Sequence, residues 1–137
     1  MVDRFCGKYK LEKSENFDEF MKALGVNIAL RKIGQVTKPQ MTISQDGDQV
    51  TFFSESSFKN IKVTFKLGED FNDTSPDGRK VINNITLDGN KLIQIEKPAA
   101  GESGKEVTYV RDIDANGDLV VVCTTEGITC TRLYKKV

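Results

Sequence analysis

Two arginines and a tyrosine in the second half of the chain are the residues best suited to binding chemistry. Arg132 and Tyr134 share one face of the final segment if that segment is a β-strand, because residues two apart in a strand point the same way. Arg111 lies on the more apolar face of a strand predicted two places earlier. If both faces point inward, two guanidinium groups that cannot lose their protons are enclosed, and no Asp or Glu shares either face. A bound carboxylate would compensate both cations, and the hydroxyl of Tyr134 would add a donor. Solvated, outward-facing arginines are the alternative.

The chain contains no histidine, which removes the usual general base near neutral pH. Ser-His-Asp and Cys-His catalysis is therefore excluded. The three cysteines, Cys6, Cys123 and Cys130, lack the C-x-x-C spacing of zinc sites. We expect a protein that is not an enzyme and holds neither a metal nor a cofactor. A lipid hydrolase or isomerase is the alternative.

Length and charge point to one folded domain spanning residues 1–137. Lys plus Arg and Asp plus Glu both number 20, so the net charge is zero, which argues against nucleic-acid binding driven by phosphate attraction. The first residues contain no apolar signal-peptide region, and no run is long enough to span a bilayer. Together with the odd number of thiols, this favours a cytoplasmic protein.

Most of the chain consists of short segments with alternating polarity, divided by turns such as Asp46-Gly47, Asp88-Gly89 and Asn116-Gly117. The spacing of 8–12 residues is typical of an antiparallel β-barrel or sandwich. Ten strands are predicted, at roughly 5–13, 39–45, 49–55, 59–66, 70–74, 79–87, 91–97, 106–113, 118–125 and 128–136.

One region has helical rather than strand periodicity. Its apolar residues recur at i, i+3, i+4 and i+7, namely Phe17, Phe20, Met21 and Leu24. Asn16 and Glu19 are placed as a capping box, and Gly25 can end the helix. Asn27 can then begin a second short helix. The two helices form a hairpin at about 16–36.

A barrel of ten strands encloses more volume than eight strands do. The chain has no Trp and only 8 Phe to fill that volume. We therefore expect a cavity with apolar walls and a cationic end, which suits an amphipathic acid.

Several motifs spread over the whole chain resemble those of the intracellular lipid-binding protein family, and most closely those of cytosolic fatty acid-binding proteins. They are GKYKL at 7–11, NFDEFM at 16–21, LRK at 30–32, SFKN at 57–60, FKLGE at 65–69, DGRKV at 77–81 and CTRLY at 130–134. The family often has Thr where this chain has Ser57. The resemblance implies an all-β fold: a ten-strand, up-and-down, calycin-type barrel capped by a helical lid.

The resemblance also implies a function and its residues. Arg132 and Tyr134 on the last strand, with Arg111 two strands earlier, would hold the carboxylate of a long-chain fatty acid. The protein would be a monomeric carrier delivering that acid to membranes or enzymes. The family's pocket and portal positions correspond to Phe17, Met21, Val26, Pro39, Ser54, Ser56, Phe58, Asp77, Arg79, Val121 and Cys123. Lys22, Arg31 and Lys32 correspond to positions that can contact anionic membranes or serve nuclear entry; an ordinary solvated surface is the alternative.

Two alternatives remain at this point. The segment 24–33 also resembles the retinoic acid-binding branch of the family, and the loop after Lys97 is longer than in many fatty acid carriers. A retinoic acid carrier is therefore the second reading of the ligand. A structural protein with an empty, water-filled interior is the other.

The last hairpin brings two cysteines together. If Glu126-Gly127 is a two-residue turn, Cys123 lies opposite Cys130. A disulfide is geometrically conceivable there, but a reducing compartment favours free thiols.

Overall fold

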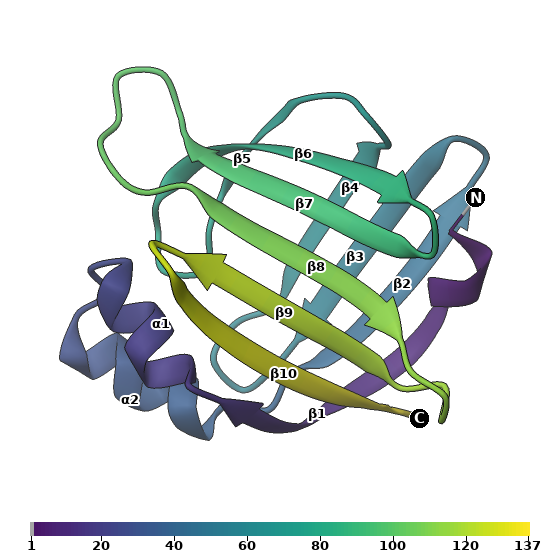
Figure 1. Ribbon diagram of the computed structural model, residues 1–137, viewed down its shortest axis with the longest axis horizontal. Helices are drawn as coiled ribbons and strands as arrows, with labels where there is room; N and C mark the ends of the chain where they lie inside the picture. Colours follow the sequence, from purple (N-terminus) through teal and green to yellow (C-terminus); the bar gives the residue numbers. More distant parts are fainter. Residues whose placement is uncertain (1) are drawn as a thin grey trace.

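The computed structural model describes residues 2–137. Ten antiparallel strands form one sheet in the order β4-β3-β2-β1-β10-β9-β8-β7-β6-β5. The strands are β1 (Gly7–Glu15), β2 (Gln40–Asp46), β3 (Gln49–Glu55), β4 (Ile61–Lys66), β5 (Phe71–Thr74), β6 (Lys80–Asp88), β7 (Lys91–Pro98), β8 (Val107–Ile113), β9 (Leu119–Thr125) and β10 (Ile128–Lys136). Figure 1 shows the sheet curled into a nearly closed barrel, with two helices at one end. The predicted fold class is confirmed.

Turn chemistry sets the register of the last hairpin. Glu126 and Gly127 both have positive φ, 47° and 77°, as a two-residue hairpin turn requires. Thr125 consequently pairs with Ile128, and Cys123 pairs with Cys130. This register places Arg132 and Tyr134 on the face predicted for them.

The first strand departs from the prediction: it begins at Gly7 rather than at residue 5. Residues Asp3–Phe5 form a turn of 3-10 helix instead, closed by a hydrogen bond from the Phe5 amide to the Val2 carbonyl. Phe5 is fully buried, and the Tyr9 hydroxyl donates to its carbonyl oxygen at 2.8 Å. Burial of an aromatic ring at the end of the barrel outweighs the strand pattern here.

The first helix, α1 (Phe17–Ala23), is present, but the predicted capping box is wrong. Asn16 adopts a left-handed conformation, with φ 64°, and its side chain makes no cap hydrogen bond. Its amide instead donates to the Thr129 carbonyl of β10 at 3.0 Å. The chain must turn sharply from β1 into α1, and Asn tolerates the left-handed region better than most residues.

The second helix, α2 (Ile28–Val36), begins as predicted. The Asn27 side chain accepts a hydrogen bond from the Leu30 amide at 2.9 Å. Gly34 lies inside α2, where a larger residue would not fit, because a Cβ there would be only 2.9 Å from the sulfur of Met21. The missing side chain lets the two helices pack closely. Neither helix, within residues 2–137, is long and apolar enough to cross a membrane.

Aromatic packing links the two ends of the strand order. β4 and β5 each pair with a single neighbour, so backbone hydrogen bonds do not join them. The rings of Phe65 on β4 and Phe71 on β5 stack with centroids 5.3 Å apart, and Phe52 meets Phe65 edge-on at 5.0 Å. These contacts narrow the gap in the barrel wall with apolar side chains.

Candidate functional site

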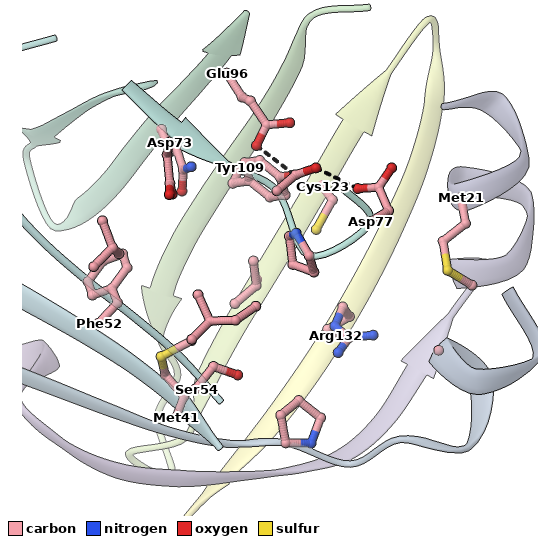
Figure 2. Close-up of a pocket in the computed structure, with 18 of the residues that line it drawn as sticks. Met21, Met41, Phe52, Ser54, Asp73, Asp77, Glu96, Tyr109, Cys123 and Arg132 are labelled. Carbon is pink, nitrogen blue, oxygen red and sulfur yellow. Dashed lines mark hydrogen bonds between the residues drawn. The ribbon is translucent and has the colours of Figure 1, made fainter. Parts of the chain in front are cut away.

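A cavity of about 330 Å³ lies between the helices and the inner face of the barrel. Its wall includes side chains from both helices and from most of the strands, and Figure 2 shows several of them converging on the same space. Apolar groups such as Phe20, Met41 and Ile85 line it together with three arginines. The cavity predicted from strand number and the scarcity of large residues is present.

Arg132 points into this cavity from β10. Its guanidinium donates to the Tyr134 hydroxyl at 3.4 Å and to the Ser14 hydroxyl at 3.2 Å. The face of the Phe17 ring lies 4.0 Å from the guanidinium carbon. No carboxylate of residues 2–137 lies within ion-pair distance of Arg132. The cation therefore contacts neutral hydroxyl acceptors and an aromatic ring, but it has no counterion within the described residues.

Arg111 on β8 is enclosed more deeply and also lacks a carboxylate partner among the described residues. It donates to the Gln94 side-chain oxygen at 2.8 Å and lies over the Phe52 ring at 4.8 Å. Burial lowers the pKa of Arg111, which indicates that its surroundings disfavour the positive charge. Because arginine stays protonated in proteins, an anion in the cavity would relieve this cost.

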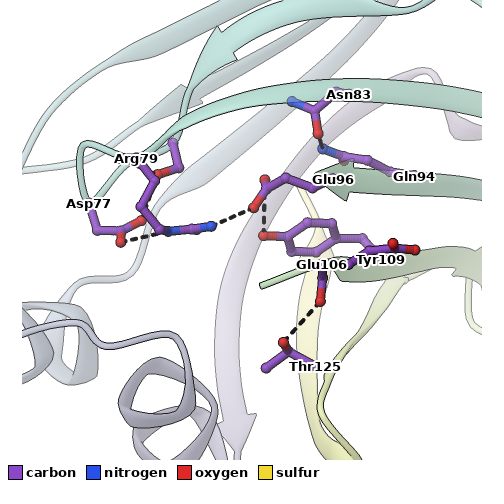
Figure 3. A network of polar contacts seen from close by, with 9 residues as sticks. Asp77, Arg79, Asn83, Gln94, Glu96, Glu106, Tyr109 and Thr125 are labelled. Carbon is purple, nitrogen blue, oxygen red and sulfur yellow. Dashed lines mark hydrogen bonds and ion pairs between the residues drawn. The ribbon is translucent and has the colours of Figure 1, made fainter. Parts of the chain in front are cut away.

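Arg79, the third arginine of the cavity wall, is already neutralised. It donates to Asp77 at 2.8 Å and to Glu96 at 2.9 Å (Figure 3). Burial lowers the pKa of Arg79, but the hydrogen bond to Asp77 and the charge of Glu96 outweigh this and raise it overall. Arg79 therefore differs from the other two arginines, although the sequence placed it in the same pocket.

Glu96 on β7 is the deepest acid of this network, with 4% of the residue exposed. Burial raises the pKa of Glu96, and the nearby positive charge of Arg79 only partly reverses the effect. The Tyr109 hydroxyl donates to its second oxygen at 3.4 Å. Burial, followed by the charge of Glu96, raises the pKa of Tyr109 and keeps its hydroxyl protonated as a donor.

The residues predicted to form the carboxylate site, the pocket and the portal converge on this one cavity. All eleven pocket and portal positions border the cavity: Phe17, Met21, Val26, Pro39, Ser54, Ser56, Phe58, Asp77, Arg79, Val121 and Cys123. Arg111, Arg132 and Tyr134 border it as well. At the helical end, the Lys59 ammonium donates to the Pro76 carbonyl at 3.0 Å and joins the β3–β4 turn to the β5–β6 turn. Phe58 beside it is 38% exposed.

The sequence and the solved structures place the chain in a known group. The model of the lipocalin / cytosolic fatty-acid binding protein family matches residues 6–137. The chain belongs to this family. It is 45% identical to the fatty acid-binding protein of Drosophila melanogaster brain, covering 96% of this chain and 98% of that one, with a TM-score of 0.85.

Two further fatty acid-binding proteins are similar over nearly the whole chain. A Schistosoma mansoni fatty acid-binding protein in complex with arachidonic acid is 36% identical, with a TM-score of 0.92 and coverage of 99% and 98%. Echinococcus granulosus fatty-acid-binding protein 1 is 33% identical, with a TM-score of 0.92 and 98% coverage of both chains. Family members of this kind are binding proteins, so the prediction that the chain is not an enzyme is confirmed.

Within this family member, the polar residues Asn83, Gln94, Glu96 and Tyr109 escaped the sequence reasoning. All four line the cavity. Asn83 occupies the apolar phase of β6. Gln94 and Glu96 occupy the buried phase of β7, whereas Ile93 and Ile95 lie on the opposite face of that strand. A polar residue on an otherwise apolar phase, the signal that marks Arg111, also marks Asn83. Alternation in β7 favours the phase of Ile93 and Ile95 instead, so it gives no such signal for Gln94 and Glu96.

The three cations predicted to contact membranes differ in their surroundings. Lys22 and Lys32 are exposed. Arg31 forms an ion pair with Asp18 at 3.0 Å and donates to the Val26 carbonyl. Two of these three cations, Lys22 and Lys32, therefore form no ion pair within residues 2–137, and the lid also exposes the apolar residues Ile28 and Ile33.

Cys123 and Cys130 are directly opposed across β9 and β10 and remain free thiols, as is Cys6. Hydrogen bonding with Cys130, followed by burial, raises the pKa of Cys123. Cys123 also borders the cavity, so its thiol is sheltered and largely protonated.

Proposed function

We propose that this protein is an intracellular, monomeric carrier that binds a long-chain fatty acid in its cavity. The observation that carries the proposal is the pair of inward guanidinium groups, Arg111 and Arg132, that lack any carboxylate partner within residues 2–137. A fatty acid carboxylate would supply the missing negative charge to both. Tyr134 would donate its hydroxyl to the same carboxylate.

The apolar part of the cavity supports a long hydrocarbon chain as the rest of the ligand. Rings and aliphatic side chains from α1, β3 and β6 make up much of the wall. Each buried methylene contributes about 0.8 kcal/mol, so a long chain supplies most of the binding free energy while the carboxylate fixes its direction.

Delivery of the ligand to membranes or enzymes is the second part of the proposal. The helical lid covers one end of the barrel, and Lys22 and Lys32 lie exposed on it. Anionic membranes would attract these charges weakly and in a salt-dependent way. We also propose that the same lid surface serves entry of the protein into the nucleus.

Competition binding tests the ligand class. Delipidated protein is loaded with a fluorescent fatty acid, and oleic acid, methyl oleate and retinoic acid are added separately. Displacement by oleic acid at the lowest concentration supports the proposal. Tighter binding of retinoic acid would replace it with the retinoid alternative, and failure of all three to bind would contradict a lipid carrier.

A further inference from the structure

Two polar side chains stand next to each other on the cavity wall, separated from Arg111 by the side chain of Gln94. Asn83 on β6 pairs with Glu96 on β7 in the sheet register, so both side chains project from the same face. Their exposures are 2% and 4%, and both border the cavity. Figure 3 shows them beside Gln94. The buried wall therefore carries an amide and a carboxylate side by side.

A chain of hydrogen bonds fixes the orientation of the Asn83 amide. Arg111 can only donate, so the Gln94 atom that it contacts at 2.8 Å must be the oxygen. The Gln94 nitrogen then donates to Asn83 Oδ1 at 2.9 Å. This leaves Asn83 Nδ2 without a hydrogen bond to an acceptor within residues 2–137. Because no fully enclosed side-chain nitrogen or oxygen of these residues lacks a partner, Nδ2 must be accessible from the cavity that Asn83 borders. A donor on a nearly inaccessible side chain thus faces the cavity without a partner.

Glu96 offers the complementary group. A carboxylate has about four acceptor positions. Among residues 2–137, two donors reach Glu96: Arg79 bonds to one oxygen and the Tyr109 hydroxyl bonds to the other at 3.4 Å. Acceptor capacity is therefore left over beside the unpartnered donor of Asn83. A hydroxyl group donates one hydrogen bond and accepts others, so it can satisfy both side chains at once.

Local charge selects against other polar groups. Asp77 and Glu96 share the single positive charge of Arg79, and Arg111 is held one side chain away, on Gln94. A second ligand carboxylate placed against the buried Glu96 would meet a like charge directly and be repelled. A neutral donor would not.

We infer that Asn83 and Glu96 form a second polar subsite that binds a hydroxyl group on the hydrocarbon chain of the ligand. The preferred cargo is then a hydroxylated long-chain fatty acid, with its carboxylate at Arg132 and Arg111 and its hydroxyl at the β6–β7 wall. This inference rests on the proposed function, because the carboxylate site sets which carbon reaches the subsite.

The test is a positional series of hydroxyoctadecanoic acids compared with octadecanoic acid itself by displacement of a fluorescent fatty acid. At one carbon or two neighbouring ones, the hydroxy acid should bind about tenfold tighter than the parent acid, since a hydrogen bond to a charged group is gained. Elsewhere along the chain it should bind more weakly, because a buried hydroxyl is left unpaired. A series in which no position exceeds the parent acid overturns the inference alone. Failure of the parent acid to bind overturns the proposed function as well.

Asn83→Leu removes the unpartnered donor, and the ratio of hydroxy acid to parent acid affinity should then fall to about one or below at the favoured position. Asn84→Leu is the matched control: Asn84 is the next residue on β6, and its amide bonds to Asp70 instead of facing the cavity. The control should keep both the parent affinity and the preference. If Asn83→Leu does not fold by circular dichroism, Asn83→Ala serves in its place. A preference that survives loss of the Asn83 amide, or that Asn84→Leu removes equally, contradicts the subsite.

Discussion

Replacing Arg132 by Met tests the carboxylate site most directly. Met keeps an unbranched apolar chain beside Phe17 but removes the charge and the donors. A hydrogen bond to a charged group is worth about 1.5–3 kcal/mol, so the affinity for oleic acid should fall about 10- to 150-fold. The loss should stop short of abolishing binding, because Arg111 remains as a second cation and the apolar wall is unchanged.

Isothermal titration with oleic acid and with methyl oleate measures this effect. The ester has the same chain but no negative charge, so Arg132→Met should weaken the acid and leave the ester nearly unaffected. Arg4→Met is the matched control, because Arg4 contacts Asp112 and two backbone carbonyls on the outer surface. Its oleic acid affinity should equal that of the unmodified protein.

Stability of the ligand-free protein separates loss of the site from loss of the fold. The Arg132→Met variant loses the cation–ring contact with Phe17 but also removes an uncompensated positive charge. These two changes have opposite effects on the free energy of unfolding. The free energy of unfolding measured in urea should therefore change by less than about 1 kcal/mol. If both Arg111→Met and Arg132→Met bind oleic acid as tightly as the unmodified protein does, these arginines do not form the carboxylate site.

Further predictions concern groups around the site. Glu96→Gln should gain stability relative to the unmodified protein as pH rises above 4.5. The raised pKa of Glu96 means that the folded state binds this proton more readily than the unfolded state does, so ionisation costs stability that Gln avoids. Urea unfolding of both proteins from pH 4 to 8 measures the difference in their free energies of unfolding, and a difference that shrinks with pH contradicts the prediction. Thiol titration of the denatured protein should give the same count with and without prior reduction, because Cys123 and Cys130 are free; a higher count after reduction would indicate a disulfide. Transfer of a fluorescent fatty acid to anionic vesicles should slow with Lys22→Glu and with added salt, and equal rates would exclude the charge mechanism. Asn27→Ala should destabilise the lid by about 1 kcal/mol, seen as faster amide exchange in α2, whereas unchanged exchange would show that the cap is dispensable.

Local pattern was sufficient for the strands and for the phase on which each of the two key arginines lies, while the resemblance to a known family was needed to choose the inward direction. Alternation within a strand has a period of two, so the phase that carries Arg132 follows from Cys130 and Tyr134 on the same side. The Glu126-Gly127 turn fixes the register of β10 against β9 by backbone geometry alone. These are short-range effects, and a single chain contains the information for them.

Pairing between distant segments lay beyond that reasoning. Arg79 and Glu96 are 17 residues apart, and only the pairing of β6 with β7 brings them to an ion pair. Asn16 satisfies the capping pattern, yet its contact with Thr129, 113 residues away, determines what its side chain does. The charge state of the cavity wall is likewise a sum over several strands.

Period-two alternation and turn residues in the amino-acid sequence were enough to predict ten antiparallel strands and to place Arg111 and Arg132 on the more apolar phases, and the family motifs selected a barrel with those phases inward. Which cations stay without a counterion was decided by the folded arrangement, because ion pairing depends on distance in space and not on separation along the chain. The same holds for the unpartnered amide of Asn83, whose orientation is imposed by Gln94 and Arg111 on other strands.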